Sequence, residues 1–146
     1  MERVLSMIGL AKKAGRVEIG EEPVGAAARA RKARIILVAS DAAPSSVRRA
    51  ASFAQHGNCP LVTIPADKDA LGRCLGRTSV AMAAVTDIGF ADAIVKKLAA
   101  LDEEYASLSD QLAAKAQRAM ERRQEQARHE KKLRRGGKSG QGRKTK

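Results

Sequence analysis

The chain has 146 residues, 44% of them apolar, with two Phe, one Tyr and no Trp. This length accommodates one ordinary domain and an appendage. Modules that stack bases on aromatic side chains need several exposed rings, so the composition argues against an aromatic-sheet or oligonucleotide-barrel binder. The net charge of +12 indicates a polyanionic partner, because neutralised phosphates release their counterions.

The positive charge is concentrated at the C-terminal end. Residues 118–146 hold 12 Lys and Arg against 3 Glu, a net charge of +9, and the first 117 residues carry +3. An anionic membrane would also attract this tail, but the tail lacks the apolar face of an interfacial helix. We see no signal peptide and no apolar stretch of about 20 residues, so we expect a cytoplasmic protein without membrane contact.

The apolar pattern predicts helices that alternate with short strands. Helices are expected over residues 2–14, 20–32, 41–56, 67–75 and 87–98, and strands over residues 16–19, 34–39, 60–64 and 78–85. The run 34–39 is continuously apolar after Arg34, which predicts a strand covered on both faces. This alternation predicts an α/β fold, a three-layer α/β/α sandwich with a small mixed central sheet.

Beyond residue 100 the composition changes. Leu101, Tyr105, Leu108 and Leu112 keep helical spacing, so the last helix either continues or packs back on the domain. We place the domain boundary near Ala100, with a basic extension over residues 101–146. This extension is expected to be helical to about residue 135 and disordered beyond, where Gly, Ser and cations cannot form a core.

Nothing in the sequence predicts an enzyme, a metal site, a cofactor or a small-molecule substrate. His56 and His129 are the only histidines, and metal-ligand spacing, a nucleophile elbow and a Walker loop are absent. His56 fits a helix C-terminus, where a cation is favourable. Cys59 and Cys74 lie in apolar runs and are expected to be small buried side chains.

The basic tail is the first candidate binding element. The cations that we expect to contact RNA phosphates are Arg122, Arg123, Lys131, Lys132, Arg134 and Arg135. The alternative is a solvated charged helix that only keeps the protein soluble. Acidic residues are too few to neutralise the tail, which favours nucleic-acid contact.

The second candidate lies in the folded part, around the predicted turn at Gly20. A tight turn into a helix presents backbone amides that suit a phosphate or a base edge. Glu21 or Glu22 is placed to accept hydrogen bonds from guanine. The cations expected nearby are Lys12, Lys13, Arg16 and Lys32. The alternative, an acidic helix start with scattered cations, fits these residues equally well.

Several motifs together resemble the kink-turn-binding ribosomal protein family, a large-subunit ribosomal protein and Gadd-type superfamily. They are the segments 9–16 (GLAKKAGR), 20–22 (GEE), 36–41 (ILVASD) and 71–77 (LGRCLGR). The segment 87–91 (DIGFA) resembles the bacterial YlxQ-type branch. The similarity spans about residues 1–98 in the right order and spacing, and the tail lies outside it.

The resemblance implies the same sandwich, no catalytic activity and an RNA surface of loops at one end of the sheet. It adds Arg73 and Arg77, beside the 76–79 loop, to the expected contacts. In relatives that bind kink-turns, the signature Gly-x-Asn-Glu-x-x-Lys reads sheared G·A pairs.

This chain departs from that signature. It keeps Gly20 but has Glu22, Pro23 and Ala26 at the three other positions, and Ala43 stands where an acid often precedes Pro. Pro23 offers neither a side-chain acceptor nor an amide proton. Each lost base-edge contact is worth roughly 1–3 kcal/mol, so little selectivity for the kink-turn is expected.

Our leading hypothesis is therefore a non-catalytic RNA-binding protein of ribosomal-protein type. Its partner would be ribosomal or other structured RNA, together with ribosome or ribonucleoprotein components. The alternative is a protein-interaction adaptor in ribosome assembly or transcription, whose tail only solubilises it.

Overall fold

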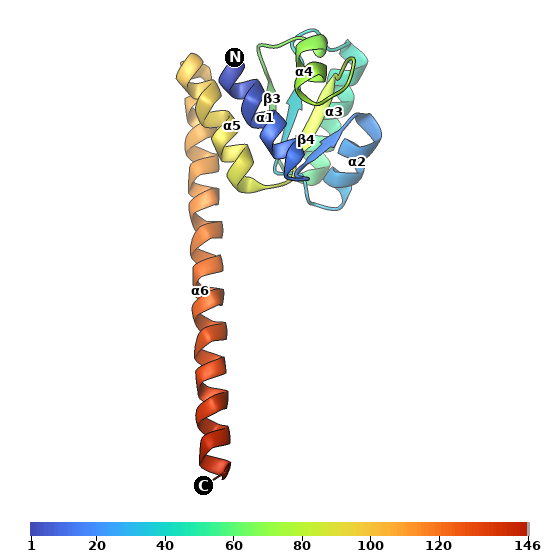
Figure 1. Cartoon of the computed structure of the whole chain (residues 1–146). Coiled ribbons are helices and arrows are strands. Elements are labelled where there is room, and N and C mark those ends of the chain that lie inside the picture. Colours follow the sequence, from blue (N-terminus) through green and yellow to red (C-terminus); the bar gives the residue numbers. More distant parts are fainter. Residues whose placement is uncertain (146) are drawn as a thin grey trace.

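The computed structural model describes residues 1–145, with the side chains of residues 1–134, and shows a three-layer sandwich with a long C-terminal helix (Figure 1). The elements in chain order are α1 (Glu2–Lys13), β1 (Val17–Ile19), α2 (Glu21–Arg29), β2 (Ile35–Val38), α3 (Pro44–Gly57), β3 (Leu61–Thr63), α4 (Lys68–Cys74), β4 (Met82–Val85), α5 (Ile88–Leu101), η1 (Glu103–Tyr105) and α6 (Ala106–Thr145). The α/β/α sandwich that the sequence predicted is confirmed.

The central sheet has four strands in the order β1-β4-β2-β3. The outer pair β2–β3 is parallel, with Ile36 opposite Leu61, and β4 runs antiparallel to both of its neighbours. One end of the sheet therefore carries the carboxyl ends of β1, β2 and β3 and the start of β4. We call it the upper end, and the opposite end the lower end.

The core lies on both faces of the sheet because successive strand residues point to opposite sides. Ile35 and Leu37 join a cluster with α1, α4 and α5, whereas Ile36 and Val38 join a second cluster with α2 and α3. All four residues of β2 are fully buried. The prediction of a strand covered on both faces is confirmed.

Several elements are shorter than the sequence predicted, most clearly β4 and α2. β4 begins at Met82 rather than near Thr78, because the preceding loop folds back on α4, with the amide of Arg77 donating to the Gly72 carbonyl at 2.8 Å. Helix α2 ends at Arg29 rather than Lys32, because Arg31 adopts a left-handed conformation with φ of 58°.

The chain breaks after α5 and packs back, which decides between the two alternatives that the sequence left open. Asp102 has extended backbone angles, and the Tyr105 hydroxyl donates to the Thr63 carbonyl at 3.0 Å. Helix α6 then runs along α5 (Figure 1) and buries Leu112 to 1% exposure in the main core. The core therefore continues past Ala100, where we expected the domain to end.

Beyond the domain, α6 extends past the lower end of the sheet (Figure 1). Its backbone is helical as far as Thr145, beyond the end that we expected near residue 135. The side chains from Arg135 onward lie outside the described residues, and the disorder expected for that stretch stays a prediction. Within residues 1–145, no helix combines the length and apolarity needed to cross a membrane.

Candidate nucleic-acid interface

The turn into α2 lies at the upper end of the sheet, beside the start of β4. Gly20 has φ of +93°, which an L side chain rarely adopts, and its amide donates to the Met82 carbonyl at 3.1 Å. Glu21 forms an ion pair with Arg49 of α3, and Glu22 is exposed. The turn therefore presents the start of a helix, with one of its two carboxylates already engaged.

A groove of about 850 Å³ runs between α1 and the end of α4, and we call it the α1–α4 groove. The cations that line it are Lys12, Lys13 and Arg73. Gly76 closes the groove with φ of +71°, and a Cβ built there would lie 3.1 Å from the Nζ of Lys12. Arg77, in the same loop, is exposed. The structure thus brings Arg73 to the same groove as Lys12 and Lys13, although they are far apart in the sequence.

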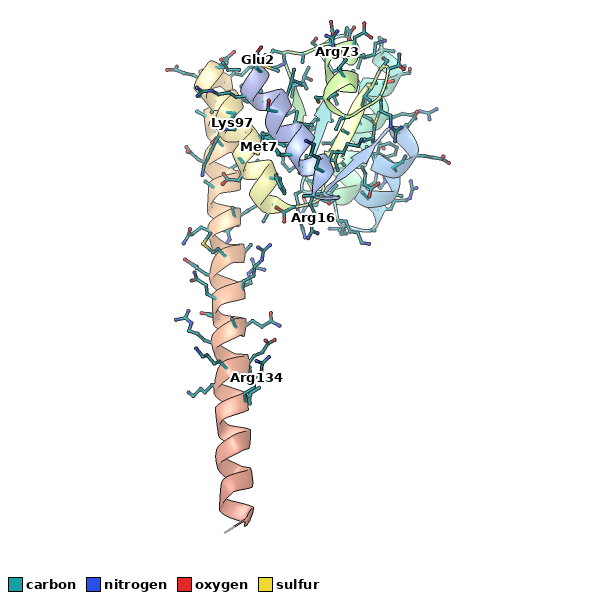
Figure 2. The ribbon with its side chains drawn as sticks, viewed as in Figure 1. Glu2, Met7, Arg16, Arg73, Lys97 and Arg134 are labelled. Atoms are coloured by element: carbon teal, nitrogen blue, oxygen red, sulfur yellow. The ribbon has the colours of Figure 1, made fainter. Side chains whose placement is uncertain are left out.

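The structure does not bring Arg16 and Lys32 to this surface. Arg16 precedes β1 and Lys32 precedes β2, so both lie at the lower end of the sheet. Figure 2 shows Arg16 and Arg73 at opposite ends of the domain. Lys12 and Lys13 end α1 one turn before Arg16, whose amide donates to the Ala11 carbonyl at 2.9 Å. Of the cations that the sequence grouped around this segment, Lys12 and Lys13 line the α1–α4 groove and Arg16 and Lys32 do not.

At the lower end, α6 and the domain enclose a cavity of about 630 Å³, which we call the basic cleft. Its lining includes seven cations, namely Arg16, Arg31, Arg34, Lys115, Arg118, Arg122 and Arg123. Asp87 is the one acid in that lining; its Oδ2 accepts from the Phe90 amide at 3.0 Å and its Oδ1 lies 3.9 Å from Arg123.

Four of these cations, Arg31, Arg34, Lys115 and Arg118, were not among the predicted site residues. A usable signal was present on α6, because Lys115, Arg118 and Arg122 follow i, i+3, i+7 spacing and share one helical face. What that face opposes depends on the path of α6, which the spacing does not reveal.

The remaining predicted cations lie further along α6. Lys131, Lys132 and Arg134 are exposed, and Arg134 lies well beyond the domain (Figure 2). The Arg135 side chain lies outside the described residues. This stretch of α6 presents charge to solvent along a single rod.

Each surface contains one free, half-buried cysteine: Cys74 in the α1–α4 groove and Cys59 in the basic cleft. Burial raises the pKa of the Cys74 thiol above its ordinary value, and the thiol donates to the Leu71 carbonyl at 3.1 Å. Burial also raises the pKa of Cys59, and the positive charges of Lys115 and Arg34 oppose that rise. Lys115 and Arg34 therefore favour the thiolate form of a cysteine that lies in the same cleft.

This arrangement predicts the pH dependence of thiol alkylation. Because the thiolate is the nucleophile and both pKa values are raised, Cys59 and Cys74 are expected to react more slowly than free cysteine at neutral pH and to accelerate at higher pH. Arg34→Gln removes a charge that lowers the Cys59 pKa, so it should slow Cys59 further. Cys74 in the same variant is the internal control, and iodoacetamide rates at both sites, followed by peptide mass spectrometry, check the prediction. An unchanged Cys59 rate would contradict it.

The fold and these surfaces define a small three-layer α/β/α protein with two separate cationic surfaces. The family model described as ribosomal protein L7Ae/L30e/S12e/Gadd45 family matches residues 2–95. The chain belongs to this family, as the sequence motifs predicted.

Individual relatives agree with this assignment. The chain is 28% identical over 92 residues to the RNA-binding protein YlxQ of Bacillus subtilis (strain 168), a match that covers 63% of this chain and 91% of that protein. Among solved structures, a Bacillus halodurans protein of unknown function aligns with a TM-score of 0.57 and 24% identity, covering 74% of this chain and 97% of the other. The Giardia lamblia 15.5kD RNA binding protein aligns with a TM-score of 0.55 and 17% identity, covering 75% and 87%. The two structures support the shared fold.

Proposed function

We propose that this chain is a non-catalytic RNA-binding protein that binds structured RNA in the cytoplasm, within ribosomal or other ribonucleoprotein particles. The observation that carries the proposal is membership of the L7Ae/L30e/S12e/Gadd45 family together with a curated RNA-binding relative that is matched over 91% of its length. The RNA would lie against the upper end of the sheet and the α1–α4 groove. The distal cations of α6 would add electrostatic affinity.

The geometry of the α1–α4 groove supports phosphate contact. Lys12, Lys13 and Arg73 are exposed and line one groove, beside a loop whose glycine leaves the backbone open to close approach. Cations and backbone amides at such a surface bind phosphates and position the nucleic acid.

The same geometry explains why we propose recognition of RNA shape rather than of sheared G·A pairs. Pro23 and Ala26 replace the Glu and Lys of the kink-turn signature. Glu21 is held by Arg49, which leaves its carboxylate less available to a base edge. The α1–α4 groove offers cations, which contact the RNA backbone.

The test is a triple charge reversal in the α1–α4 groove. Lys12→Glu, Lys13→Glu and Arg73→Glu in the full chain should weaken binding to a structured RNA by more than tenfold, because three phosphate contacts become repulsive. Fluorescence anisotropy with a kink-turn RNA and a plain duplex of equal length measures the loss, and we expect similar losses on the two RNAs.

The matched control reverses the same amount of charge on another face. Arg3, Lys96 and Lys97 line a separate cavity between α1 and α5, and their reversal to Glu should have a much smaller effect. Equal losses in the two triples would mean that net charge alone matters. RNA affinity unaffected by the groove triple, with co-purified protein that survives nuclease and high salt, would favour the adaptor alternative.

A further inference from the structure

We propose that the basic cleft is a second RNA site, which takes the sugar–phosphate backbone, so that one chain holds two RNA segments on two separate surfaces. The proposal rests on the proposed function for its ligand class, but none of its residues belongs to the α1–α4 groove. The cleft residues come from two separate parts of the chain, the lower end of the sheet and the side of α6.

The two walls of the cleft are held in place by the fold. Arg16 and Arg34 immediately precede β1 and β2, and the amide of Arg34 donates to the Val85 carbonyl at 2.8 Å. The α6 wall is anchored by Leu112, one turn before Lys115, and by the contact of Arg123 with Asp87. The cations therefore face one another across a preformed cavity.

The cleft has far more positive than negative charge. Its lining has seven cations and one acid, and that acid is already in contact with Arg123. Among the described side chains, none of the other six cations takes part in an ion pair. An anionic ligand would neutralise this concentration of positive charge. Six of the seven cations are Arg, and the planar guanidinium of Arg binds phosphate through two parallel hydrogen bonds.

The length of the cationic surface favours a polymer over a single small anion. Along α6 the cleft cations run from Lys115 to Arg123, about 12 Å at 1.5 Å per residue. Further exposed cations follow at Arg128 and Lys131, on the opposite side of this helix. Among the described residues that line the cleft, none has an aromatic side chain on which a base would stack. We therefore assign it to the sugar–phosphate backbone of RNA.

The two cysteines provide a separate reporter for each surface in the full chain. Saturating RNA hairpin of about two helical turns should slow iodoacetamide alkylation of Cys59 by roughly tenfold, since bound backbone covers the thiol and its negative charge lowers the thiolate fraction. Cys74, in the α1–α4 groove, should be slowed as well if that groove also binds RNA, as proposed above.

Substitutions should separate the two effects. Arg31→Glu, Arg118→Glu and Arg122→Glu are expected to abolish the slowing of Cys59 while that of Cys74 persists, and Lys12→Glu, Lys13→Glu and Arg73→Glu should do the reverse. All six residues are exposed. The same positions changed to Gln provide a second, milder series, and circular dichroism confirms that each variant is folded.

The outcomes distinguish the two proposals. Slowing of Cys74 alone would overturn the cleft site and leave the proposed function standing. Slowing of Cys59 alone would support the cleft and overturn the groove. Slowing of Cys59 by RNA that persists in both the Glu and the Gln variants of the cleft would overturn the cleft proposal. Slowing of Cys59 by polyglutamate but not by RNA would also overturn it, and would indicate an acidic protein partner. No slowing at either site, with no RNA binding by anisotropy, would overturn both.

Discussion

Replacement of Leu112 by alanine is expected to lower the free energy of unfolding by about 3 kcal/mol, within the range of roughly 2–5 kcal/mol for fully buried leucines. Leu112 is 1% exposed and belongs to the same core cluster as Ile94 and Leu98 of α5, although it lies on the C-terminal helix. Truncation creates a cavity that the surrounding helices fill only in part. Urea denaturation of the full chain measures the change.

Leu133 on the same helix is the matched control. It is 61% exposed, so Leu133→Ala removes the same atoms with little change in buried area, and stability should stay within about 0.5 kcal/mol of the wild type. Similar small losses in both variants would mean that the first part of α6 does not pack on the domain in solution. A large loss for Leu112→Ala alone would also mean that fragments for binding studies must extend past Leu112.

Deletion of residues 128–146 is expected to remove a large part of the salt dependence of RNA binding. This segment holds 9 Lys and Arg against 1 Glu, a net charge of +8, and leaves the core and the basic cleft intact. If five of its cations neutralise phosphates, the log–log salt slope changes by roughly 4.5. The full chain should then lose roughly 500-fold more affinity than the shortened chain between 50 and 200 mM salt.

Two comparisons make this result interpretable. A chain that keeps its length but carries Gln at Arg128, Lys131, Lys132 and Arg134 should lose part of the slope, because charge and not helix length is responsible. Equal slopes for the full and shortened chains, with a lower solubility of the shortened one, would show that the tail only solubilises the protein.

Much of the fold was predictable because its signals are local. The apolar run that forms β2 indicated burial on both faces, and the apolar spacing indicated the alternation of helices and strands. The errors at Lys32 and Thr78 have a common cause. In both places the chain leaves a regular element through a turn, closed by hydrogen bonds or by a left-handed residue, and periodicity does not report such turns.

The candidate site was predictable only in part. The sequence identified Lys12, Lys13 and Arg73 as cations near family motifs, and the structure brings them into one groove. It also grouped Arg16 with Gly20, which is only four residues away. Strand β1 lies between them and, at about 3.3 Å per residue, carries the two roughly 13 Å apart, to opposite ends of the sheet.

By itself, the sequence determined the alternation of helices and strands, the family, the excess of positive charge and its concentration in the tail, because each depends on residue identity and local spacing. Only the tertiary structure decided the strand order β1-β4-β2-β3, the return of the chain at Asp102 and the meeting of Arg118 and Arg122 with Arg16 and Arg34. These features depend on contacts between residues far apart in the chain. Strand direction and the burial of Leu112 select those contacts, and no short window of sequence contains them.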